Sequence, residues 1–183
     1  KPLTKDAVAL LKNAFESFEW QAGPRILVTG GSGLLGHALQ SHLNNETYTC
    51  KFLSSQDGDL RDYEQTERVF QQFHPTHVIH AAADVGGLYK HLNSNFDIGI
   101  NNTLMNLNVI KCALKFEVQN LIAISSTCVF PEAQTSFSES QVQTGAPHLS
   151  NADYAMSKRT MHMHVSKVRK TLGYQWNVLI PCN

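Results

Sequence analysis

Short apolar, β-rich runs alternate with helical segments from Gly23-Pro24 onward, and this alternation limits the fold more than any other feature of the chain. Strand and helix repeated in turn, with strands that are apolar almost throughout, is typical of a parallel sheet covered by helices on both faces. We therefore predict an α/β fold with a doubly wound parallel sheet. The predicted strands are 25–29, 48–54, 76–82, 120–126 and 176–181, and the predicted helices are 34–44, 62–73, 94–118 and 151–172.

A glycine-rich turn, TGGSGLLG, follows the first predicted strand directly and precedes a predicted helix. Because glycine has no Cβ, such a turn lets backbone amides and the positive end of a helix approach a pyrophosphate. An ordinary glycine-rich turn is the alternative, but the placement between strand and helix favours nucleotide binding. We therefore predict an NAD(P)-binding Rossmann fold. The predicted cofactor contacts in this turn are Gly30, Gly31, Ser32, Gly33, Leu34, Leu35 and Gly36.

The usual doubly wound strand order predicts where the ligand crevice opens. In that order the first and fourth strands lie side by side, at the point where the winding reverses. The crevice should open at the carboxyl ends of these two strands. Ser126, at the end of the fourth predicted strand, should then emerge beside the glycine turn.

The end of the second predicted strand bears on the choice between NAD and NADP. An acidic side chain there favours NAD, because it binds the 2′-hydroxyl of the adenosine ribose. This strand ends in Ser54-Ser55-Gln56, so no carboxylate repels a 2′-phosphate. NADP is permitted and slightly preferred. No arginine stands at that point either, and Lys51 and Arg61 are the nearest cations.

Tyr154 and Lys158 lie four residues apart near the start of the last long predicted helix. This spacing places them on one helix face, so a phenol and an ammonium can share one pocket. Tyrosine has an unperturbed pKa of about 10, and a nearby cation lowers that pKa by stabilising the phenolate. A packed tyrosine beside a solvated lysine is the alternative. The order of glycine turn, strand-end Ser126 and Tyr-Lys pair favours proton transfer, with the serine hydroxyl bonded to a substrate oxygen.

Composition and charge exclude several classes of function. The chain has 183 residues, 42% of them hydrophobic, which suits one domain with a core. Fifteen basic residues balance fifteen acidic ones, so we expect no nucleic acid partner. No apolar run approaches the roughly 20 residues that span a bilayer, and no signal-peptide pattern is present. We expect no membrane association and a cytoplasmic location.

Residues 1–24 precede the strand and helix alternation and are predicted to form an amphipathic helix with a linker. Apolar residues keep helical spacing from Thr4 to Trp20, and Thr4 is the expected N-cap. The polar side mixes both charges, which favours packing on the domain or on a partner chain over membrane binding. Residues 25–183 form the predicted NAD(P)-binding domain. The chain begins at Lys1 rather than methionine, so processing or a fragment boundary lies upstream.

Cysteine and histidine spacing predicts neither a disulfide framework nor a metal site. The cysteines form no CxxC pair and lie mostly in apolar segments, which suits reduced thiols. They are Cys50, Cys112, Cys128 and Cys182. The side chains of His77 and His80 should face opposite sides of a strand, and those of His162 and His164 should diverge on a helix.

The motifs in this order resemble the extended short-chain dehydrogenase/reductase superfamily. HAAADVGGLYKH, SSTCVFP and PHLSNADYAMSKR look like the GDP-L-fucose synthase family, the GDP-4-keto-6-deoxy-mannose epimerase/reductases. The resemblance runs from about Arg25 to Asn183, and the VGG loop and Ser126-Thr127-Cys128 are its most specific pieces. Related sugar-nucleotide 4,6-dehydratases carry a Thr-Asp-Glu type triplet where this chain has Ser126-Thr127-Cys128. The difference argues against dehydration chemistry.

The resemblance implies a reaction and roles for four residues. Members of the family take a keto sugar attached to GDP, invert carbons 3 and 5, and then reduce the ketone at carbon 4 with NADPH. Cys128 matches the thiol that exchanges protons during epimerisation, although by itself it would be interpreted as a buried structural thiol. Tyr154 matches the acid that protonates the carbonyl oxygen as hydride arrives. Ser126 would hold that oxygen, and Lys158 would tune Tyr154 and bind the nicotinamide ribose.

Further cofactor contacts are implied by the same resemblance. Asp59 and Leu60 would border the adenine, and Asn101 would support the catalytic group from a neighbouring helix. The last residues match a Pro-Thr-Asn segment that lies against the nicotinamide, with Cys182 in place of threonine. The implied cofactor contacts outside the glycine turn are Asp59, Leu60, Ala81, Ala82, Ala83, Asn101, Ser125, Lys158, Pro181 and Asn183.

Members of the resembled family continue beyond this segment into a smaller domain, which binds the GDP moiety and supplies a histidine partner to the cysteine. Neither feature occurs in this sequence, so we expect a truncated member whose substrate domain is absent. The expected partners are a GDP-sugar substrate and a second copy of the chain in a homodimer. The alternatives are a non-catalytic dinucleotide-binding or interaction protein derived from the family, and another sugar-nucleotide epimerase or reductase.

Overall fold

The computed structural model describes residues 23–43, 48–86, 88–132 and 136–181. The predicted helix at 4–20 and the predicted cofactor contact Asn183 lie outside these residues. None of the helices in the described part of the chain combines the length and apolar character that a bilayer span requires.

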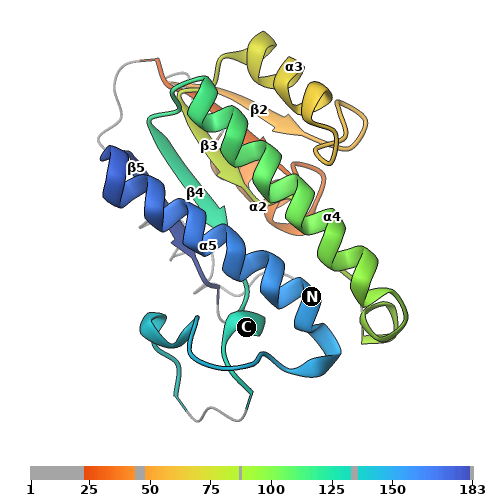
Figure 1. The fold of residues 1–183 in the computed structure, drawn as a ribbon. Helices are drawn as coiled ribbons and strands as arrows, with labels where there is room; N and C mark the ends of the chain where they lie inside the picture. The colour runs from red at the N-terminus through yellow and green to blue at the C-terminus, as the bar shows by residue number, and fades with distance from the viewer. Residues whose placement is uncertain (1–22, 44–47, 87, 133–135, 182–183) are drawn as a thin grey trace.

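Five parallel strands form one sheet in the order β2-β1-β3-β4-β5, which confirms the predicted parallel α/β fold (Figure 1). Every predicted strand is present, with ends that differ from the prediction by at most two residues. The strands are β1 (Arg25–Thr29), β2 (Thr49–Leu53), β3 (His77–His80), β4 (Asn120–Ile124) and β5 (Gln175–Leu179).

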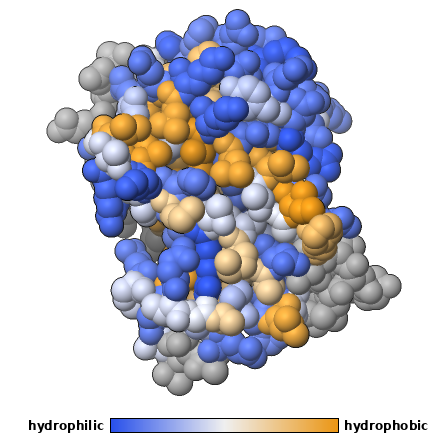
Figure 2. All heavy atoms as spheres, viewed as in Figure 1, coloured by the Kyte–Doolittle hydropathy of each residue, from blue (hydrophilic) through white to orange (hydrophobic). Residues whose placement is uncertain are grey.

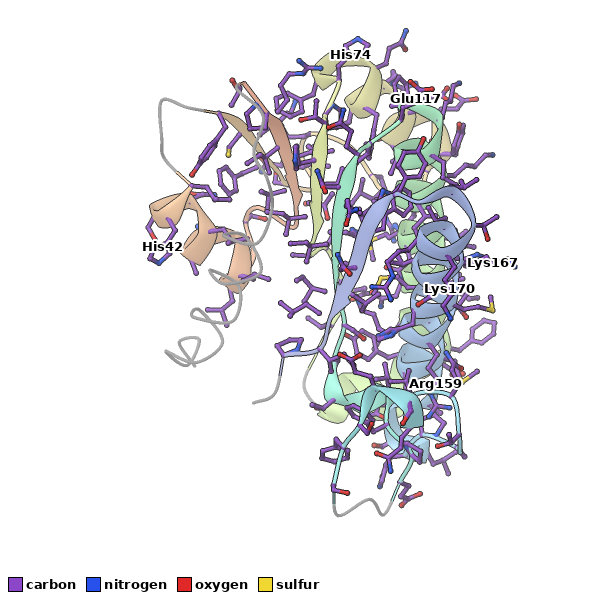
Figure 3. All side chains as sticks on the ribbon, turned by 90° about the vertical axis from the view of Figure 1, so that its left-hand side faces the viewer. His42, His74, Glu117, Arg159, Lys167 and Lys170 are labelled. Atoms are coloured by element: carbon purple, nitrogen blue, oxygen red, sulfur yellow. The ribbon has the colours of Figure 1, made fainter. Side chains whose placement is uncertain are left out.

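Helices cover both faces of this sheet. Seen edge-on, α2 lies on one face while α4 and α5 lie on the other (Figure 3). The helix α4 starts six residues before its predicted beginning at residue 94. The helices are α2 (Leu34–His42), α3 (Tyr63–Phe73), α4 (Leu88–Lys115) and α5 (Ala152–Leu172), with the short 3₁₀ turns η1 (Thr127–Val129), η2 (Glu139–Gln141) and η3 (Leu149–Asn151).

The predicted strand order is wrong at one place, because β1 lies beside β3 and not beside β4. The chain lays only one strand, β2, on the outer side of β1 before it crosses back. The strand β3 therefore takes the place next to β1, in a register that pairs Thr29 with His80. The approach is close at Gly30, where φ is +71° and an added Cβ would lie 2.8 Å from the Ala82 nitrogen. Ser126 and the glycine turn are consequently separated by the end of β3.

Alternate residues of the central strands point to two separate cores. Ile26 and Val28 of β1 pack with Leu39 of α2 on one face. Leu27 points to the opposite face and belongs to a larger core shared with α3, α4 and α5, which includes the fully buried Trp176. Strands buried on both faces explain why the runs of this sequence are apolar almost throughout.

A buried hydrogen-bond chain fixes the carboxyl ends of β1 and β3 to α4. Thr29 Oγ1 lies 2.8 Å from His80 Nδ1 and accepts a bond from the Ala82 nitrogen at 3.1 Å. His80 Nε2 lies 2.9 Å from the Asn106 Oδ1. Because the carboxamide oxygen can only accept, Nε2 carries the proton and Nδ1 accepts from the threonine hydroxyl. This chain of hydrogen bonds holds the backbone of Ala82, just after β3, in place.

Candidate active site

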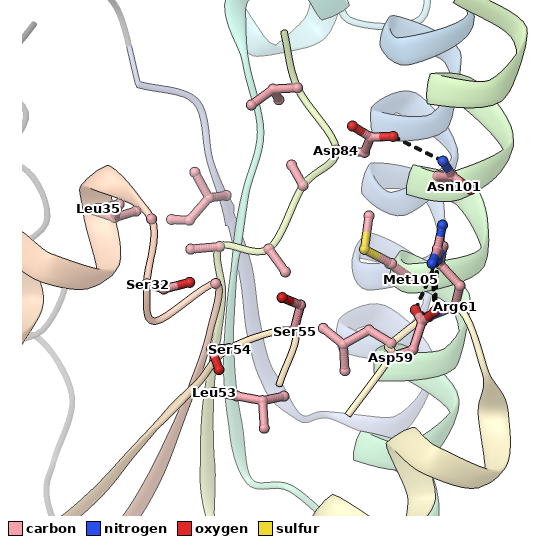
Figure 4. Close-up of a pocket in the computed structure, with 18 of the residues that line it drawn as sticks. Ser32, Leu35, Leu53, Ser54, Ser55, Asp59, Arg61, Asp84, Asn101 and Met105 are labelled. Carbon is pink, nitrogen blue, oxygen red and sulfur yellow. Dashed lines mark hydrogen bonds and ion pairs between the residues drawn. The ribbon is translucent and has the colours of Figure 1, made fainter. Parts of the chain in front are cut away.

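A cavity of about 720 Å³ opens at the carboxyl ends of the strands, where the sequence predicts the crevice (Figure 4). The glycine turn lines one side, and α4 contributes Asn101 and Met105 on the opposite side. Tyr154 and Lys158 of α5 line it as well, together with Ser125 after β4. The fold thus gathers into one cavity residues that are up to 128 positions apart in the sequence, from Gly30 to Lys158.

The glycine turn brings the start of α2 to the cavity. Gly33 is the N-cap of α2, and no acidic side chain occupies the first turn of this helix. An added Cβ at Gly36 would collide with the carbonyl oxygens of Gly30 and Gly31, so the helix can pack this close to the turn only with glycine there. The free backbone N–H groups at the helix start favour an anion. This cradle fits the pyrophosphate of a dinucleotide.

The segment that follows β2 presents hydroxyl groups and one arginine to the cavity. Ser54, Ser55 and Arg61 line it, together with Asp59 (Figure 4). Arg61 forms a two-pronged ion pair with Asp59, with Nη2 2.7 Å from Oδ2, and this pair lowers the pKa of Asp59. Asp57 instead accepts hydrogen bonds from the backbone nitrogen and the hydroxyl of Ser54, both at 2.8 Å. This arrangement suits a 2′-phosphate better than an unpaired carboxylate would.

Tyr154 and Lys158 share the cavity as predicted, but their electrostatics differ from the prediction. The Lys158 Nζ lies 5.8 Å from the centre of the Tyr154 ring and donates to the Ile124 carbonyl oxygen at 2.9 Å. Burial raises the pKa of Tyr154 to about 12, with a smaller contribution from Cys128. Burial also lowers the pKa of Lys158 to about 8. The expected lowering of the tyrosine pKa is therefore wrong, because burial of the phenol disfavours its charged form.

Only one of the two serines after β4 lies where the sequence places it. Ser125, not Ser126, lines the cavity. The Ser125 hydroxyl lies 2.8 Å from His162 Nε2, and burial together with Lys158 lowers the pKa of His162 to about 4. Ser126 caps η1, where its hydroxyl accepts from the Cys128 nitrogen at 3.3 Å. Sequence spacing alone could not have paired His162 with a serine 37 residues earlier.

Cys128 is half-buried and is not among the residues that line the cavity. Its sulfur accepts a hydrogen bond from the Asn151 Nδ2 at 3.1 Å. The thiols of Cys50 and Cys112 have pKa values raised by burial, to about 11 and about 12. Among the described residues no group of three His, Cys, Asp or Glu side chains is arranged to hold a metal ion.

Asp84 is a cavity residue that the sequence analysis missed. Its Oδ2 accepts from the Asn101 Nδ2 at 2.9 Å (Figure 4), and its backbone is tied to Asn102 by bonds of 3.0 and 2.8 Å. The available signal was an acidic residue directly after the three alanines that follow β3. Asn101, expected to support the catalytic group, thus orients a carboxylate in the same cavity.

Most of the predicted cofactor contacts line the cavity, and a few do not. Gly31 and Gly36 pack the turn against β2 and α2, and Pro181 follows β5 without lining the cavity. Those that line it are Gly30, Ser32, Gly33, Leu34, Leu35, Asp59, Leu60, Ala81, Ala82, Ala83, Asn101, Ser125 and Lys158.

Comparison with known proteins identifies relatives over most of the chain. It is 37% identical over 164 residues to a probable GDP-L-fucose synthase from Drosophila melanogaster, covering 87% of this chain and 51% of that protein. It is 35% identical over 164 residues to GDP-L-fucose synthase from Dictyostelium discoideum, covering 86% of this chain and 51% of that protein. The chain therefore spans about half the length of these curated relatives.

Solved structures share the fold. A GDP-L-fucose synthetase from Naegleria fowleri, bound to NADP, superposes with a TM-score of 0.81 at 36% identity, covering 91% of this chain and 56% of that one. The model of the NAD dependent epimerase/dehydratase family matches residues 26–183, which include the cavity and all of the sheet except Arg25. The chain belongs to the NAD dependent epimerase/dehydratase family.

Proposed function

We propose that this chain is the cofactor-binding part of an NADP-dependent epimerase/reductase of the GDP-L-fucose synthase type, acting on GDP-4-keto-6-deoxy-D-mannose. The observation that carries the proposal is the single cavity that joins the helix start after the glycine turn to Tyr154 and Lys158. The relatives named GDP-L-fucose synthase support the substrate class. Epimerisation followed by reduction classes the protein as both isomerase and oxidoreductase.

The cavity offers a place for each part of NADPH. The N-terminus of α2 would hold the pyrophosphate, and Ser54, Ser55 and Arg61 would hold the 2′-phosphate. Asp59 and Leu60 would border the adenine. The alanines after β3 would line the path toward Lys158. When bound, the cofactor supplies the hydride that reduces the ketone.

The four proposed catalytic residues divide the proton transfers. Tyr154, whose pKa is about 12, is protonated at neutral pH and would donate its proton to the ketone oxygen as reduction proceeds. Lys158 would hold the nicotinamide ribose and stabilise the phenolate that remains. Ser126 would bind the same oxygen after a change of its present bond to Cys128. Cys128 would exchange protons with the sugar carbons beside the ketone.

We further propose a homodimer in the cytoplasm. The described part of α4 exposes Phe96, Ile100, Leu104 and Leu107 at helical spacing on one face, and α5 beside it exposes Met163. Figure 2 shows an apolar band across this side of the molecule, over α4 and α5. A second copy with the same two helices would cover the band, and its test is given in the Discussion.

Calorimetric titration of NADPH into this chain tests the cofactor site. Gly33 faces the cavity with φ of −83°, and an added Cβ would contact only the Gly30 carbonyl oxygen, at 3.2 Å. The variant Gly33→Asp should fold and should lose NADPH affinity by at least about tenfold, because its carboxylate repels the pyrophosphate. The matched control Gly33→Asn adds the same volume without charge, and it should lose much less.

The outcomes separate the proposal from its alternatives. Unchanged NADPH affinity in both Gly33→Asp and Gly33→Asn would place the pyrophosphate elsewhere. Addition of GDP-4-keto-6-deoxy-D-mannose to the NADPH complex should lower nicotinamide absorbance once all substrate-binding residues are present. If this chain binds NADPH but does not oxidise it when the sugar is added, the result would support a chain that only binds the cofactor. The absence of any NADPH binding would contradict the proposal.

A further inference from the structure

Asn151 precedes Tyr154 by one helical turn, and its side chain faces Cys128. The Asn151 Nδ2 donates to the Cys128 Sγ at 3.1 Å. The other polar atom of the same carboxamide, Oδ1, is buried and has no hydrogen-bond partner among the described residues. The carboxamide therefore has one described polar contact, and that contact is the sulfur.

The position of Asn151 in the chain makes this contact unusual. It is the N-cap of α5, where asparagine ordinarily accepts a hydrogen bond from the backbone of the first helical turn. Here the side chain makes no such cap bond. The turn η3 runs directly into α5, and the Ala152 N–H bonds to the Leu149 carbonyl oxygen of that turn. The Asn151 carboxamide is therefore not needed as a cap, and its nitrogen donates to the thiol instead.

Both partners are held in place by backbone turns. The Asn151 nitrogen donates to the His148 carbonyl oxygen at 3.2 Å within η3. The Cys128 nitrogen donates to the Ser126 hydroxyl at 3.3 Å within η1. Cys128 is also close enough to Tyr154 to contribute to its raised pKa. The amide and the sulfur are therefore held against each other near the start of α5.

A carboxamide can serve a sulfur atom in both of its protonation states. A thiolate only accepts hydrogen bonds, whereas a thiol can also donate one. The amide nitrogen suits the thiolate, and a half-turn about the last side-chain torsion would present Oδ1 to the S–H group. Since Oδ1 has no other partner among the described residues, this rotation would break no second bond there.

We propose that Asn151 is a positioning residue that holds the sulfur of Cys128 and follows its change of protonation. The inference rests on the proposed function, in which Cys128 exchanges protons with the sugar. In that step a C–H bond of the sugar breaks, its electron pair passes to the adjacent ketone, and the proton forms an S–H bond. The reverse step returns a proton from sulfur to carbon. Asn151 itself neither gains nor loses a proton.

The rate at which iodoacetamide alkylates Cys128 at pH 7.5 tests the inference without cofactor or sugar. The thiolate is the reactive form, so loss of its hydrogen-bond donor should slow alkylation. Asn151→Leu keeps the shape and removes the donor, and we expect a rate about three- to tenfold lower. Asn151→Asp also removes the donor and adds a negative charge, so it should be slowed at least as much. Mass spectrometry of the Cys128 peptide, with Cys112 as the buried internal reference, gives the rates.

Ser150→Ala is the matched control, because it alters the same turn at a half-buried residue whose hydroxyl makes a solvent-exposed bond to His148. Its rate should equal that of the unchanged chain. An unchanged or faster rate in Asn151→Leu would overturn the inference, since the amide would then be a spacer or a shield. If that variant does not fold, the rate of Asn151→Asp decides in the same way. Failure of the proposed function would appear separately, as loss of NADPH binding with the alkylation pattern intact.

Discussion

At the scale of the residue, Arg61 is the cation that we propose binds the 2′-phosphate. Its guanidinium lines the cavity beside Ser54 and Ser55, and the side chain is half-exposed although paired with Asp59. An exposed pair of this kind contributes little to stability, so the arginine can turn toward a phosphate at small cost. Neither serine brings a negative charge. An Arg61 side chain turned in this way would bring a positive charge to a 2′-phosphate.

Arg61→Ala should weaken the binding of NADPH more than the binding of NADH. Loss of a charge-assisted bond to the 2′-phosphate should lower the affinity for NADPH by about tenfold or more, whereas the affinity for NADH should change by less than about twofold. Calorimetry with both cofactors measures this difference. Arg61→Lys keeps a cation and should retain part of the preference, and Arg61→Ala with Asp59→Asn controls for the carboxylate left unpaired. Equal weakening of the two cofactors would contradict the assignment.

At the scale of the element, buried histidines join the strands to the helices. His80 ties β1 and β3 to α4, and burial lowers its pKa to about 3. Burial also lowers the pKa values of His77 and His162 to about 4. In the unfolded chain a histidine has a pKa of about 6.5, so that state takes up the proton first as the pH falls. The stabilisation is complete above pH 6.5 and is lost between that pH and the folded-state values.

The free energy of unfolding should therefore fall as the pH is lowered from 6.5 to 4.5. His80 alone should contribute a slope approaching about 1.4 kcal/mol for each pH unit over this window. Urea unfolding of His80→Gln should show a shallower dependence on pH than the unchanged chain, apart from its lower stability at pH 7. His37→Gln, at an exposed position, is the control and should keep the original slope. An identical slope in His80→Gln would show that His80 is already charged or exposed in the folded chain.

At the scale of the whole molecule, the outer side of the helices on one face of the sheet exposes apolar residues. The helices α4 and α5 pack along each other over the larger core, yet their outer side carries exposed apolar residues (Figure 1). Phe96, Ile100 and Leu104 recur at four-residue spacing, which places them on one face of α4. Contiguous exposed apolar surface marks sites of association more often than single exposed residues do.

Sedimentation equilibrium should give twice the 20.4 kDa mass of the chain at micromolar concentration. The double variant Ile100→Glu with Met163→Glu places charges in the apolar band of both helices, and it should sediment as a monomer with unchanged circular dichroism. Leu172→Glu changes an equally exposed residue on the other side of α5 and should remain a dimer. A monomer in the unchanged chain, or a dimer that survives the double variant, would rule out this interface.

The sequence by itself determined which elements form. Strands such as β4 are buried on both faces at their centre, so Leu121, Ile122 and Ala123 must be apolar, while the long helices need only one apolar side. The glycine turn was equally readable, because the approach of Gly30 to Ala82 excludes every larger side chain. These constraints act over a few residues, so a local pattern records them. The same holds for the four-residue spacing of Tyr154 and Lys158.

Only the tertiary structure decided which strand ends meet and what their side chains experience. Local pattern is the same whether β3 or β4 lies beside β1, so the order had to come from the packed sheet. The pKa of Tyr154 rises rather than falls because burial is a property of all the surrounding elements. Ser125 with His162, Asp84 with Asn101, and Cys128 with Asn151 each join residues at least 17 positions apart. Such contacts leave no period in the sequence, because they exist only after distant segments have packed together.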